Sequence, residues 1–265
     1  HRRLQMTAAP VVAAVLVTHN SAKVIEPTLR SIDQQTQLPA TRIAIDDSSS
    51  DGTVQLLETG NFDVERSTST SRDLSTRIAH NFLQGVRAAT RAGADIVVLG
   101  DHDDVWHPKR IEHQVRLLHE NPRISMVASD GFLIDEHDAA IPGTIRQSFP
   151  VPDDFMSLRR SKQLPYALRH SIATGGACAI RPANLEDWSV PSGWLHDRWW
   201  SLESLRRGQL LIDATPVIDY RVTDSQQVGL DQKDQDDPRR WVAAKAAALP
   251  STSRRVVQLA RLLRK

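Results

Sequence analysis

Apolar and polar positions alternate along the first half of the chain in blocks typical of strands followed by helices. Residues 11–17 form a short, β-branched, nearly continuous apolar run, which predicts a strand buried on both faces. The polar residues 18–21 that follow are a helix-start signal, and Ile25, Leu29 and Ile32 then recur at helical spacing. The chain therefore begins with a predicted strand–helix unit.

The same alternation continues to residue 128. Short apolar runs predict further strands at residues 42–45, 62–65, 94–99 and 125–128. Apolar residues at helical spacing predict helices between them, at residues 53–58, 74–86 and 108–118. Strands that alternate with helices are typical of a doubly wound sheet, so we predict an α/β fold with a mostly parallel central sheet flanked by helices.

Beyond Asp130 the pattern becomes irregular, because prolines interrupt it at positions 142, 150, 152, 165, 182 and 191. No low-complexity linker separates this part from the first half. We interpret residues 131–230 as a second, irregular half of the same domain that closes over the site and meets a second substrate. Residues 231–265 are interpreted as a basic helical tail.

Composition and charge narrow the class of protein. The 265 residues are 40% hydrophobic and 25% charged, as in an ordinary globular protein. The formal net charge of +1 gives no global field for a nucleic-acid partner. A single cysteine, Cys178, excludes an internal disulfide and fits a reducing compartment, so we expect a cytoplasmic location. No apolar run approaches the roughly 20 residues of a membrane span.

The charge is unevenly placed, because the stretch from Arg239 to Lys265 holds eight Lys or Arg residues and no acid. Val256, Leu259 and Leu263 share one helical face in this tail. A basic amphipathic helix fits peripheral contact with the anionic inner face of a membrane. The same pattern equally fits a helix that packs on the domain with a solvated charged face.

The most informative segment is Asp101-His102-Asp103-Asp104, directly after the apolar run 96–100. Three carboxylates in four residues repel each other, and a bound cation between them relieves that repulsion. A strand that ends in such a cluster presents hard oxygen ligands for Mg²⁺ or Mn²⁺ at the edge of a sheet, where ligands of open α/β sheets bind. A solvated acidic turn is the alternative interpretation.

A second acidic turn, from Asp46 to Gly52, follows the predicted strand 42–45. Asp47, Asp51 and Glu58 fall at ligand positions of a calcium-binding EF-hand loop. An EF-hand requires a helix before the loop, and a strand precedes it here. The turn instead predicts a carboxylate at the same sheet edge as Asp101, able to accept a hydrogen bond from a base or ribose, with helix capping by Asp51 as the structural alternative.

Three segments occur in the order and spacing of a known family: residues 15–20, 45–53 and 101–106. Together they resemble the signatures of family 2 glycosyltransferases of the GT-A fold. The pattern Asp-x-Asp-Asp-x-Trp-x-Pro, from Asp101 to Pro108, resembles the rhamnosyltransferase-like branch, and residues 220–229 point the same way. The resemblance covers residues 11–230 and implies a Rossmann-like GT-A domain.

The resemblance implies a nucleotide-diphosphate-sugar donor bound by residues 1–130. Thr18, Asn20 and Asp46 or Asp47 would line the nucleoside pocket. Asp101 would contact the ribose or the metal. Asp103 would bind the Mg²⁺ or Mn²⁺ that bridges the diphosphate. A divalent cation stabilises the charge that develops on the leaving nucleoside diphosphate, and it needs only one or two protein carboxylates.

The resemblance also implies an acceptor-binding and catalytic half, residues 131–230. An inverting transfer needs a carboxylate that removes the acceptor hydroxyl proton, and in this family that residue lies near the start of a helix after the metal motif. Asp197 is the candidate, with a helix cap or an ion pair to Arg198 as the alternative. The glycines of the Thr174–Ala177 segment resemble an acceptor-side turn and permit close backbone approach. They are Gly175 and Gly176.

Two tryptophans and one arginine complete the candidate set. Trp199 and Trp200 fit either stacking on a sugar ring or burial in the core. Arg221 belongs to a stretch that in related sequences reads Tyr-Arg-x-His-x-x-Asn-x-x-Gly. Here Thr223 stands at the His position and Gln226 at the Asn position, so the metal or diphosphate contact that the His would make is missing, and Asp224 and Arg221 are the candidates to supply it.

The function that the sequence predicts is a metal-dependent inverting hexosyltransferase. It would move a sugar, rhamnose on the branch resemblance, from a nucleotide-sugar to a hydroxyl of a glycan or lipid-linked acceptor in cell-wall or polysaccharide biosynthesis. One alternative is a catalytically degenerate glycan-binding or scaffold module. A sugar nucleotidyltransferase is a second, although the loop after the first strand, residues 18–22, lacks the glycines that such enzymes use.

Overall fold

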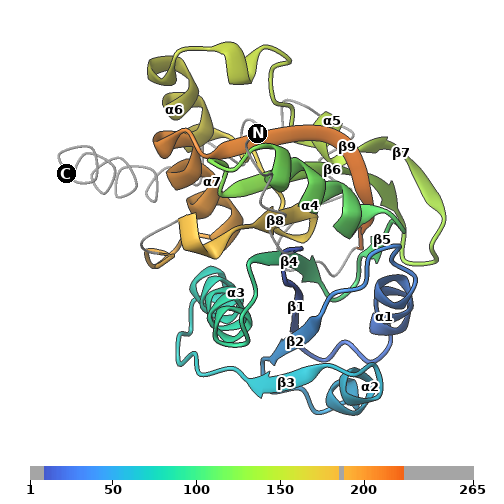
Figure 1. The fold of residues 1–265 in the computed structure, drawn as a ribbon. Coiled ribbons are helices and arrows are strands. Elements are labelled where there is room, and N and C mark those ends of the chain that lie inside the picture. The colour runs from blue at the N-terminus through green and yellow to red at the C-terminus, as the bar shows by residue number, and fades with distance from the viewer. Residues whose placement is uncertain (1–8, 185–187, 224–265) are drawn as a thin grey trace, which may run out of the picture.

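The apolar runs of the first half form four adjacent parallel strands in the order β3-β2-β1-β4. The computed structural model describes residues 9–184 and 188–223. Within those residues the strands belong to one nine-stranded sheet (Figure 1). The four parallel strands are β1 (Val12–Thr18), β2 (Thr41–Asp46), β3 (Asp63–Arg66) and β4 (Ile96–Asp101).

Helices cover both faces of this parallel part, which explains why every residue of β1 is buried. α1 and α2 lie on one side of the strands and α3 on the other (Figure 1). The buried residues of α1 and α3 recur at helical spacing, so the predicted strand–helix alternation is confirmed. The helices are α1 (Ile25–Asp33), α2 (Thr53–Thr59) and α3 (Leu74–Arg91).

The predicted helix start at residues 18–21 is wrong by several residues. Thr18 still belongs to β1, and α1 begins only at Ile25. Asn20 has a left-handed backbone with φ of 48°, and the amide of Ser21 donates to Thr53 Oγ1 at 2.7 Å. These residues form a loop because their polar groups bond across to the loop after β2 instead of capping their own helix.

The second half of the chain holds more regular structure than its prolines indicate. β8 (Cys178–Ile180) extends the sheet antiparallel to β4, and β6 (Met126–Ile134) pairs with β8 and with β9 (Leu210–Arg221). The sheet is therefore mixed: its first four strands are parallel, β8 is antiparallel to both β4 and β6, and β6 and β9 are parallel to each other. Pro142 is tolerated in β7 (Ala140–Thr144) because, of the described strands, β7 pairs with β6 alone and needs no second set of hydrogen bonds.

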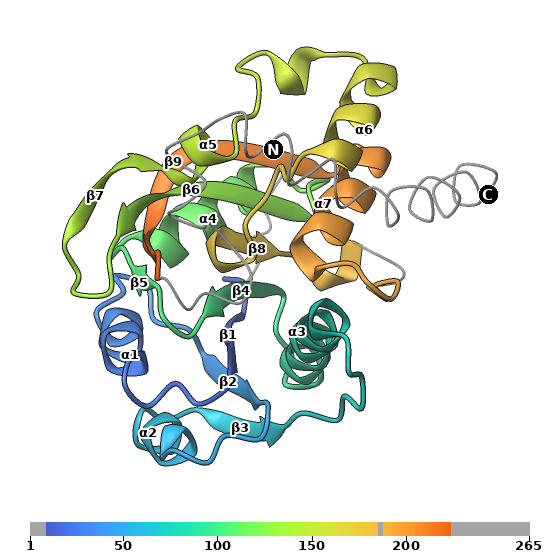
Figure 2. The same cartoon turned by 180° about the vertical axis from the view of Figure 1, so that it is seen from behind.

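The remaining elements complete the second half, as the reverse view in Figure 2 shows. β5 (Val105–Trp106) pairs antiparallel with β9. Helices α6 and α7 pack against each other beside β9. A single turn of 3₁₀ helix at Gly175–Ala177, called the glycine turn below, leads into β8. The helices are α4 (Arg110–Glu120), α5 (Ile145–Ser148), α6 (Arg160–Arg169) and α7 (His196–Arg207).

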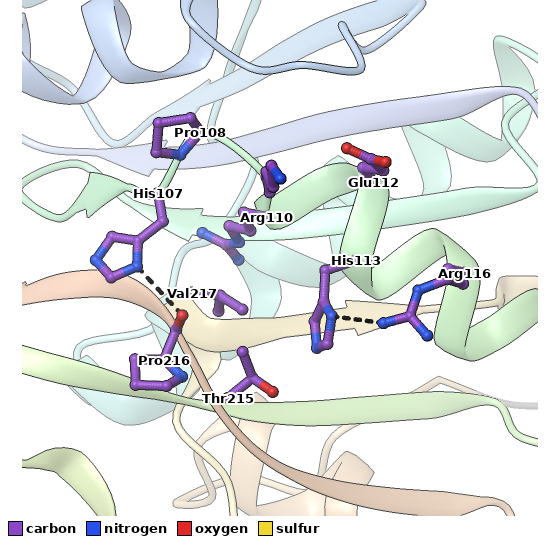
Figure 3. A pocket seen from close by; sticks show the side chains of 10 residues that line it. His107, Pro108, Arg110, Glu112, His113, Arg116, Thr215, Pro216 and Val217 are labelled. Atoms are coloured by element: carbon purple, nitrogen blue, oxygen red, sulfur yellow. Dashed lines mark hydrogen bonds between the residues drawn. The ribbon is translucent and has the colours of Figure 1, made fainter.

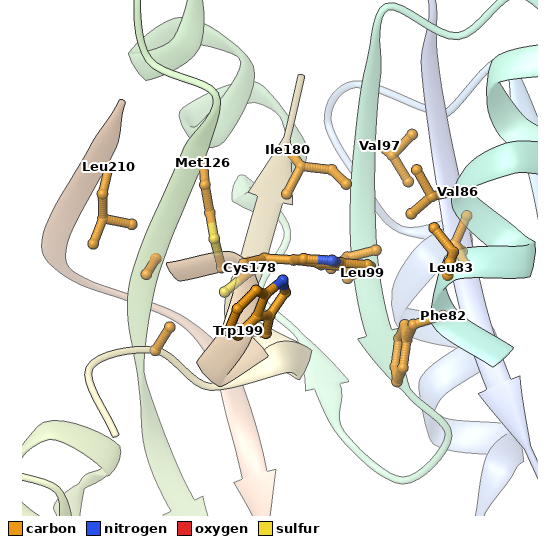
Figure 4. Close-up of a cluster of buried hydrophobic side chains, with 14 of the residues drawn as sticks. Phe82, Leu83, Val86, Val97, Leu99, Met126, Cys178, Ile180, Trp199 and Leu210 are labelled. Atoms are coloured by element: carbon orange, nitrogen blue, oxygen red, sulfur yellow. The ribbon is translucent and has the colours of Figure 1, made fainter. Parts of the chain in front are cut away.

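The two faces of the sheet carry separate hydrophobic clusters. One joins α3 and α7 across β4, β8 and β6, and it includes Phe82, Leu99, Cys178 and Trp199 (Figure 4). The other lies under α1 and α4 and includes Trp106. Both clusters pack against β4, so the strand that ends in the acidic segment is held rigidly from two sides.

Candidate functional site

The carboxyl ends of β1, β2 and β4 meet at one edge of the sheet. In the strand register, Thr18 lies opposite Asp46 and Val17 lies opposite Asp101. The three polar segments singled out in the sequence therefore lie side by side. This is the edge at which ligands bind in open α/β sheets.

Asp46 organises the loop after β2. Its side chain is buried and accepts hydrogen bonds from Thr18 Oγ1 at 3.1 Å, from the Ser49 amide at 2.9 Å and from Ser49 Oγ at 2.5 Å. The buried Thr18 hydroxyl is used in the same contact. Both residues lie where the sequence predicts, and their polar atoms hold the β1 and β2 loops together.

Asp47 presents its carboxylate differently. Its Oδ2 forms an ion pair with Arg77 Nε of α3 at 2.7 Å. Asn20 is exposed and accepts a hydrogen bond from the Ser50 amide at 2.9 Å. Because the carboxylate of Asp46 already accepts hydrogen bonds from Thr18 and Ser49, Asp47 and Asn20 are the better placed of the candidate nucleoside contacts.

The calcium alternative does not fit the loop. Asp51 accepts from the Thr53 hydroxyl and amide, at 2.6 and 3.2 Å, and from the Ala22 amide at 3.0 Å. The hydrogen bond from Thr53 is the main reason that the pKa of Asp51 is lowered. Asp51, just before the N-cap residue Gly52, therefore bonds the first residue of α2, and β2 precedes the loop where an EF-hand has a helix.

The acidic segment Asp101–Asp104, called the acidic lip below, packs directly against the glycine turn. A Cβ placed on Gly176 would lie 2.5 Å from Asp104 Oδ2 and 2.7 Å from Asp101 Oδ2. The two carboxylate oxygens thus converge on one backbone position. Only glycine fits there, because any side chain would collide with both oxygens.

Burial and mutual repulsion dominate the electrostatics of the acidic lip. Burial, and then the charge of Asp103, raise the pKa of Asp101 to about 7. Burial, followed by Asp103 and Asp101, raises the pKa of Asp104 well above its usual range. Carboxylates with these shifts bind a cation favourably, because a cation offsets both the lost hydration and the repulsion.

The residues present fit a divalent cation held with few protein ligands. Asp104 Oδ2 is buried and has no hydrogen-bond partner among the described residues. Within residues 9–184 and 188–223, no three His, Cys, Asp or Glu side chains are arranged to hold a metal ion by themselves. Mg²⁺ and Mn²⁺ sites of the phosphate-binding type use one or two carboxylates and leave positions for phosphate oxygens, which matches this set.

Asp197 lies in the first turn of α7, on the other side of the glycine turn. Its Oδ2 accepts a hydrogen bond from the Gly175 amide at 3.1 Å, and its Oδ1 accepts from the Arg198 amide at 2.7 Å. Burial raises the pKa of Asp197, and these hydrogen bonds oppose the shift. The charge of Asp197 also contributes to the raised pKa of Asp101, so the two carboxylates interact electrostatically.

The neighbouring His196 has no proton-transfer role. Its ring is buried and stacks on Phe82 at 3.8 Å between ring centroids, with Trp200 edge-on at 5.2 Å. Both ring nitrogens lack hydrogen-bond partners among the described residues. Burial lowers the pKa of His196 to about 3, so the ring is neutral near neutral pH. The His196 ring packs directly against Gly175, and it fits there because glycine has no Cβ.

The prediction that Trp199 and Trp200 contact the acceptor needs correction. Trp199 is 6% exposed and Trp200 only 1% exposed, and both belong to the hydrophobic cluster between α3 and α7 (Figure 4). Trp200 Nε1 donates to the carbonyl of Trp188 at 2.9 Å. Neither ring offers a free face to a sugar, so the alternative interpretation as core aromatics is the one that holds.

Arg221, at the end of β9, is tied to the acidic lip. Its backbone amide donates to Asp104 Oδ1 at 3.1 Å, and its Nε donates to the Asp103 carbonyl at 2.9 Å. Its guanidinium also pairs with Asp138 at 2.6 Å. Arg221 therefore positions the segment that carries the carboxylates. The rest of the stretch from Tyr220 to Gly229, beginning at residue 224, lies outside the described residues, as does the basic tail.

The sequence pattern places Asp104 in the acidic cluster without an individual role, and it does not identify Arg110. The dense spacing of carboxylates is the signal that includes Asp104. Arg110 is 1% exposed and lies close enough to oppose the pKa shifts of Asp101 and Asp104. No sequence signal distinguishes Arg110, because an arginine one residue after Lys109 reads as part of an exposed basic helix start.

Two hollows in the described surface lie away from the acidic lip. The first, about 530 Å³, lies between the start of α4 and β9, with His107 and His113 on opposite sides and Thr215 below them (Figure 3). The second, about 590 Å³, lies between α3 and residues 181–183. Three basic side chains of the first hollow already contact acidic groups of the protein: His107 lies 2.8 Å from Asp219, His113 lies 2.8 Å from Asp213, and Arg116 pairs with Glu120 at 3.5 Å.

Among the described residues, none of the helices combines the length and apolar character needed to cross a membrane. The longest of the described helices is α3, whose polar face bonds to the end of β3, for example through Gln84 Nε2 to the Arg66 carbonyl at 2.9 Å.

The fold and the edge of the sheet define an α/β protein with an acidic cluster at the carboxyl ends of its parallel strands. Residues 13–185 match the profile of Glycosyl transferase family 2, which is more than half of the chain. The chain therefore belongs to this family, and its sheet and helices have the GT-A arrangement. A comparison with curated proteins finds no match.

Solved structures share the fold at low sequence identity. S. aureus TarS 1-349 in complex with UDP is 16% identical, with a TM-score of 0.55 over 80% of this chain and 61% of that one. Glucosyl-3-phosphoglycerate synthase from Mycobacterium tuberculosis, with Mn²⁺, UDP and glucosyl-3-phosphoglycerate, is 17% identical, with a TM-score of 0.54 over 91% of this chain and 80% of that one.

A third similar structure is the mannosyltransferase PcManGT from Pyrobaculum calidifontis with GDP-Man and Mn²⁺. It is 17% identical, with a TM-score of 0.51 over 84% of this chain and 59% of that one. The chain thus spans about three fifths of the length of the TarS 1-349 and PcManGT structures.

Proposed function

We propose that this chain is a metal-dependent, inverting glycosyltransferase that uses a nucleotide-diphosphate-sugar and a hydroxyl acceptor on a glycan or glycolipid. One observation carries the proposal. The glycine turn has the acidic lip on one side, with Asp101 and Asp104 against Gly176, and Asp197 bonded to Gly175 on the other. A cation-binding centre and a candidate base are thereby joined by two adjacent residues.

The donor binds along the edge formed by β1, β2 and β4. Asn20 and Asp47 contact the nucleoside, while Thr18 and Asp46 hold the two loops in place. Asp101 and Asp103 hold Mg²⁺ or Mn²⁺, with Asp104 supporting them through its unpartnered Oδ2. The bound cation supplies Lewis-acid stabilisation of the diphosphate leaving group. Structures of the M. tuberculosis synthase and PcManGT, which contain Mn²⁺, support this assignment.

Asp197 is the general base of the transfer. Its carboxylate takes the proton of the acceptor hydroxyl as that oxygen forms a bond to the anomeric carbon, and the bond from that carbon to the diphosphate oxygen breaks. The diphosphate leaves with the electron pair from the opposite face, which inverts the anomeric configuration. The burial that raises the pKa of Asp197 strengthens it as a base, and the Gly175 amide fixes its orientation.

The sugar that fits the sequence pattern is rhamnose. The Asp-x-Asp-Asp-x-Trp-x-Pro pattern from Asp101 to Pro108 supports this finer assignment, and Trp106 is buried beneath the acidic lip. The basic tail supports a lipid-linked acceptor, because residues 239–265 hold eight Lys or Arg residues without an acid. A tail that contacts membrane makes the full chain sediment with anionic phosphatidylserine vesicles and not with neutral phosphatidylcholine vesicles.

A thermal-shift screen tests the donor site. Nucleoside diphosphates and nucleotide sugars, including a rhamnose donor, are added with Mn²⁺, Mg²⁺ or EDTA. A ligand that binds only the folded state stabilises it and so raises Tm. At a ligand concentration of a hundred times Kd, the free energy of unfolding increases by about 2.7 kcal/mol. The expected result is a shift that requires metal and is lost in Asp103→Ala but kept in the exposed control Asp153→Ala. No shift with any nucleotide refutes the transferase and favours a glycan-binding module.

A further inference from the structure

The buried guanidinium of Arg110 lies behind the acidic lip, at the start of α4. It stacks on the Trp106 ring with 3.9 Å between its Cζ and the ring centroid. It donates to the Leu99 carbonyl at 2.5 Å and to the Cys178 carbonyl at 3.4 Å. Leu99 precedes Asp101 in β4, and Cys178 follows the glycine turn. The guanidinium therefore joins the two chain segments that carry the site.

Gln114, one helical turn further along α4, reinforces the same connection. Its Oε1 accepts from Arg110 Nε at 3.3 Å, and its Nε2 donates to the Ala177 carbonyl at 2.9 Å and to Ser129 Oγ at 3.1 Å. Gln114 is fully buried. Two consecutive carbonyls at the end of the glycine turn, those of Ala177 and Cys178, are thus bonded to side chains of α4.

A buried cation is costly unless something nearby compensates it. Burial lowers the pKa of Arg110 to about 9, and the charges of Asp104 and Asp101 oppose that shift. No Asp or Glu oxygen forms an ion pair with this guanidinium in the described part of the chain, so the carboxylates act on it at longer range. The arrangement gives the acidic lip a fixed positive charge that remains when no divalent cation is bound.

We propose that Arg110 is a positioning residue, which ties β4 to the glycine turn and so keeps Gly176 against the carboxylates of Asp101 and Asp104. The inference rests on the proposed function, because those carboxylates are the proposed metal site. The competing view is that Arg110 stabilises the fold without influencing cation binding. The two views differ in what a conservative substitution does to metal dependence.

The test compares Arg110→Lys with Arg181→Lys. Arg181 is the control, because its guanidinium likewise donates to backbone carbonyls, in its case those of Leu118, Pro122 and Ile124. It follows the other end of β8, away from the acidic lip. We would measure Tm, kcat and the KM for the donor for each purified full-length variant. We would also measure the Mn²⁺ concentration that gives half of the Tm shift caused by the nucleoside diphosphate.

Groups that orient metal ligands typically change metal affinity by about 10–100-fold when they are altered. We expect Arg110→Lys to raise the required Mn²⁺ concentration by about tenfold or more, because lysine keeps the charge and loses the two-carbonyl contact. Arg181→Lys lowers Tm and leaves the Mn²⁺ requirement unchanged. An equal Mn²⁺ requirement in the two folded variants overturns the inference.

A second pair covers the case in which Arg110→Lys does not fold. Gln114→Met removes the bonds to Ala177, Arg110 and Ser129 without changing charge. The control Gln163→Met, in α6, removes a buried bond to the Phe155 carbonyl. A raised Mn²⁺ requirement in Gln114→Met alone supports the inference, and equal requirements overturn it. If the unaltered protein binds no nucleotide with Mn²⁺, the proposed function fails and this inference fails with it.

Discussion

The backbone amide of Gly175 donates a hydrogen bond to Asp197 Oδ2 at 3.1 Å. The next residue, Gly176, leaves no room for a Cβ beside Asp101 and Asp104. One dipeptide therefore fixes the distance between the proposed base and the proposed metal site. Small movements of this turn alter both parts together, so only substitutions that remove one contact at a time distinguish the base from the metal site.

Replacing the proposed base removes catalysis and leaves donor binding. Asp197→Asn keeps the shape of the side chain and removes the negative charge that accepts the proton. We expect kcat to fall by about 10²–10⁴-fold, the usual contribution of a general base. The metal-dependent Tm shift with the donor nucleotide is expected to persist. Asp153→Asn, at an exposed position, is the control, and an Asp197→Asn enzyme with unaltered kcat contradicts the assignment.

Adding one methyl group to the glycine turn disrupts the metal site. In Gly176→Ala the new Cβ meets carboxylate oxygens 2.5 and 2.7 Å away, so Asp101 and Asp104 must move apart. Overpacking of this kind costs about 1–3 kcal/mol of stability, and we expect the Mn²⁺-dependent Tm shift to be lost as well. Gly60→Ala is the control, because its Cβ would meet nothing closer than 3.4 Å. Retained metal dependence in Gly176→Ala argues against this site.

The buried His196 makes the fold sensitive to acid. Its pKa is lowered from 6.5 to about 3 by burial, so the unfolded chain binds the proton first. Stability from this residue is intact above pH 6.5 and falls as the pH drops from 6.5 toward 3. The slope is about 1.4 kcal/mol per pH unit, which amounts to about 2 kcal/mol between pH 6.5 and 5.

Urea unfolding at several pH values measures this effect. His196→Phe keeps a ring against Phe82 and cannot be protonated, so we expect its stability to fall by about 2 kcal/mol less than that of the unaltered protein over the same range. His137→Gln, at an exposed position with 81% of its side chain accessible, leaves the pH dependence unchanged. Parallel stability curves for the unaltered protein and His196→Phe refute the prediction.

Replacing Asp46 and replacing Asp47, at the end of β2, are expected to have different effects on stability and on donor binding. Asp46→Ala leaves the buried Thr18 hydroxyl and the Ser49 amide without their acceptor, which costs about 1–3 kcal/mol for each buried group left unpaired. Asp47→Ala removes a partly exposed ion pair with Arg77, worth about 0–1 kcal/mol. We expect lowered stability in the first variant and weakened donor affinity at nearly normal Tm in the second. Lowered stability in Asp47→Ala together with weakened donor affinity in Asp46→Ala would contradict this assignment of the structural role to Asp46 and of the donor contact to Asp47.

Local patterns predict much of the fold because they reflect burial on one or two faces. The continuous apolar run of β1 is buried at every residue, and the spacing of Phe82 and Val86 in α3 marks the face that packs on the sheet. The local pattern places the start of α1 too early, because the amides of residues 20 and 21 donate to Ser49 and Thr53, which are 29 and 32 residues further along the chain. Such a partner leaves no trace in the local sequence.

The same limit explains the tryptophans and Arg110. Trp199 and Trp200 follow Asp197 closely, so adjacency suggested an acceptor role, and packing between α3 and α7 decided that they are core residues. Arg110 stands in a basic, helix-starting stretch. Its burial follows from the way in which α4 crosses behind β4 and β8, which places its guanidinium against two carbonyls of separate strands.

The sequence by itself determined the alternation of strands and helices, the acidic segment at the end of β4 and the family to which the chain belongs, because each of these depends on residues close together in the chain. The tertiary structure alone decided that Gly176 faces Asp101 and Asp104 while Gly175 bonds to Asp197. That convergence joins segments separated by many residues, and it arises because β8 packs antiparallel to β4 and brings the glycine turn to the carboxyl end of that strand.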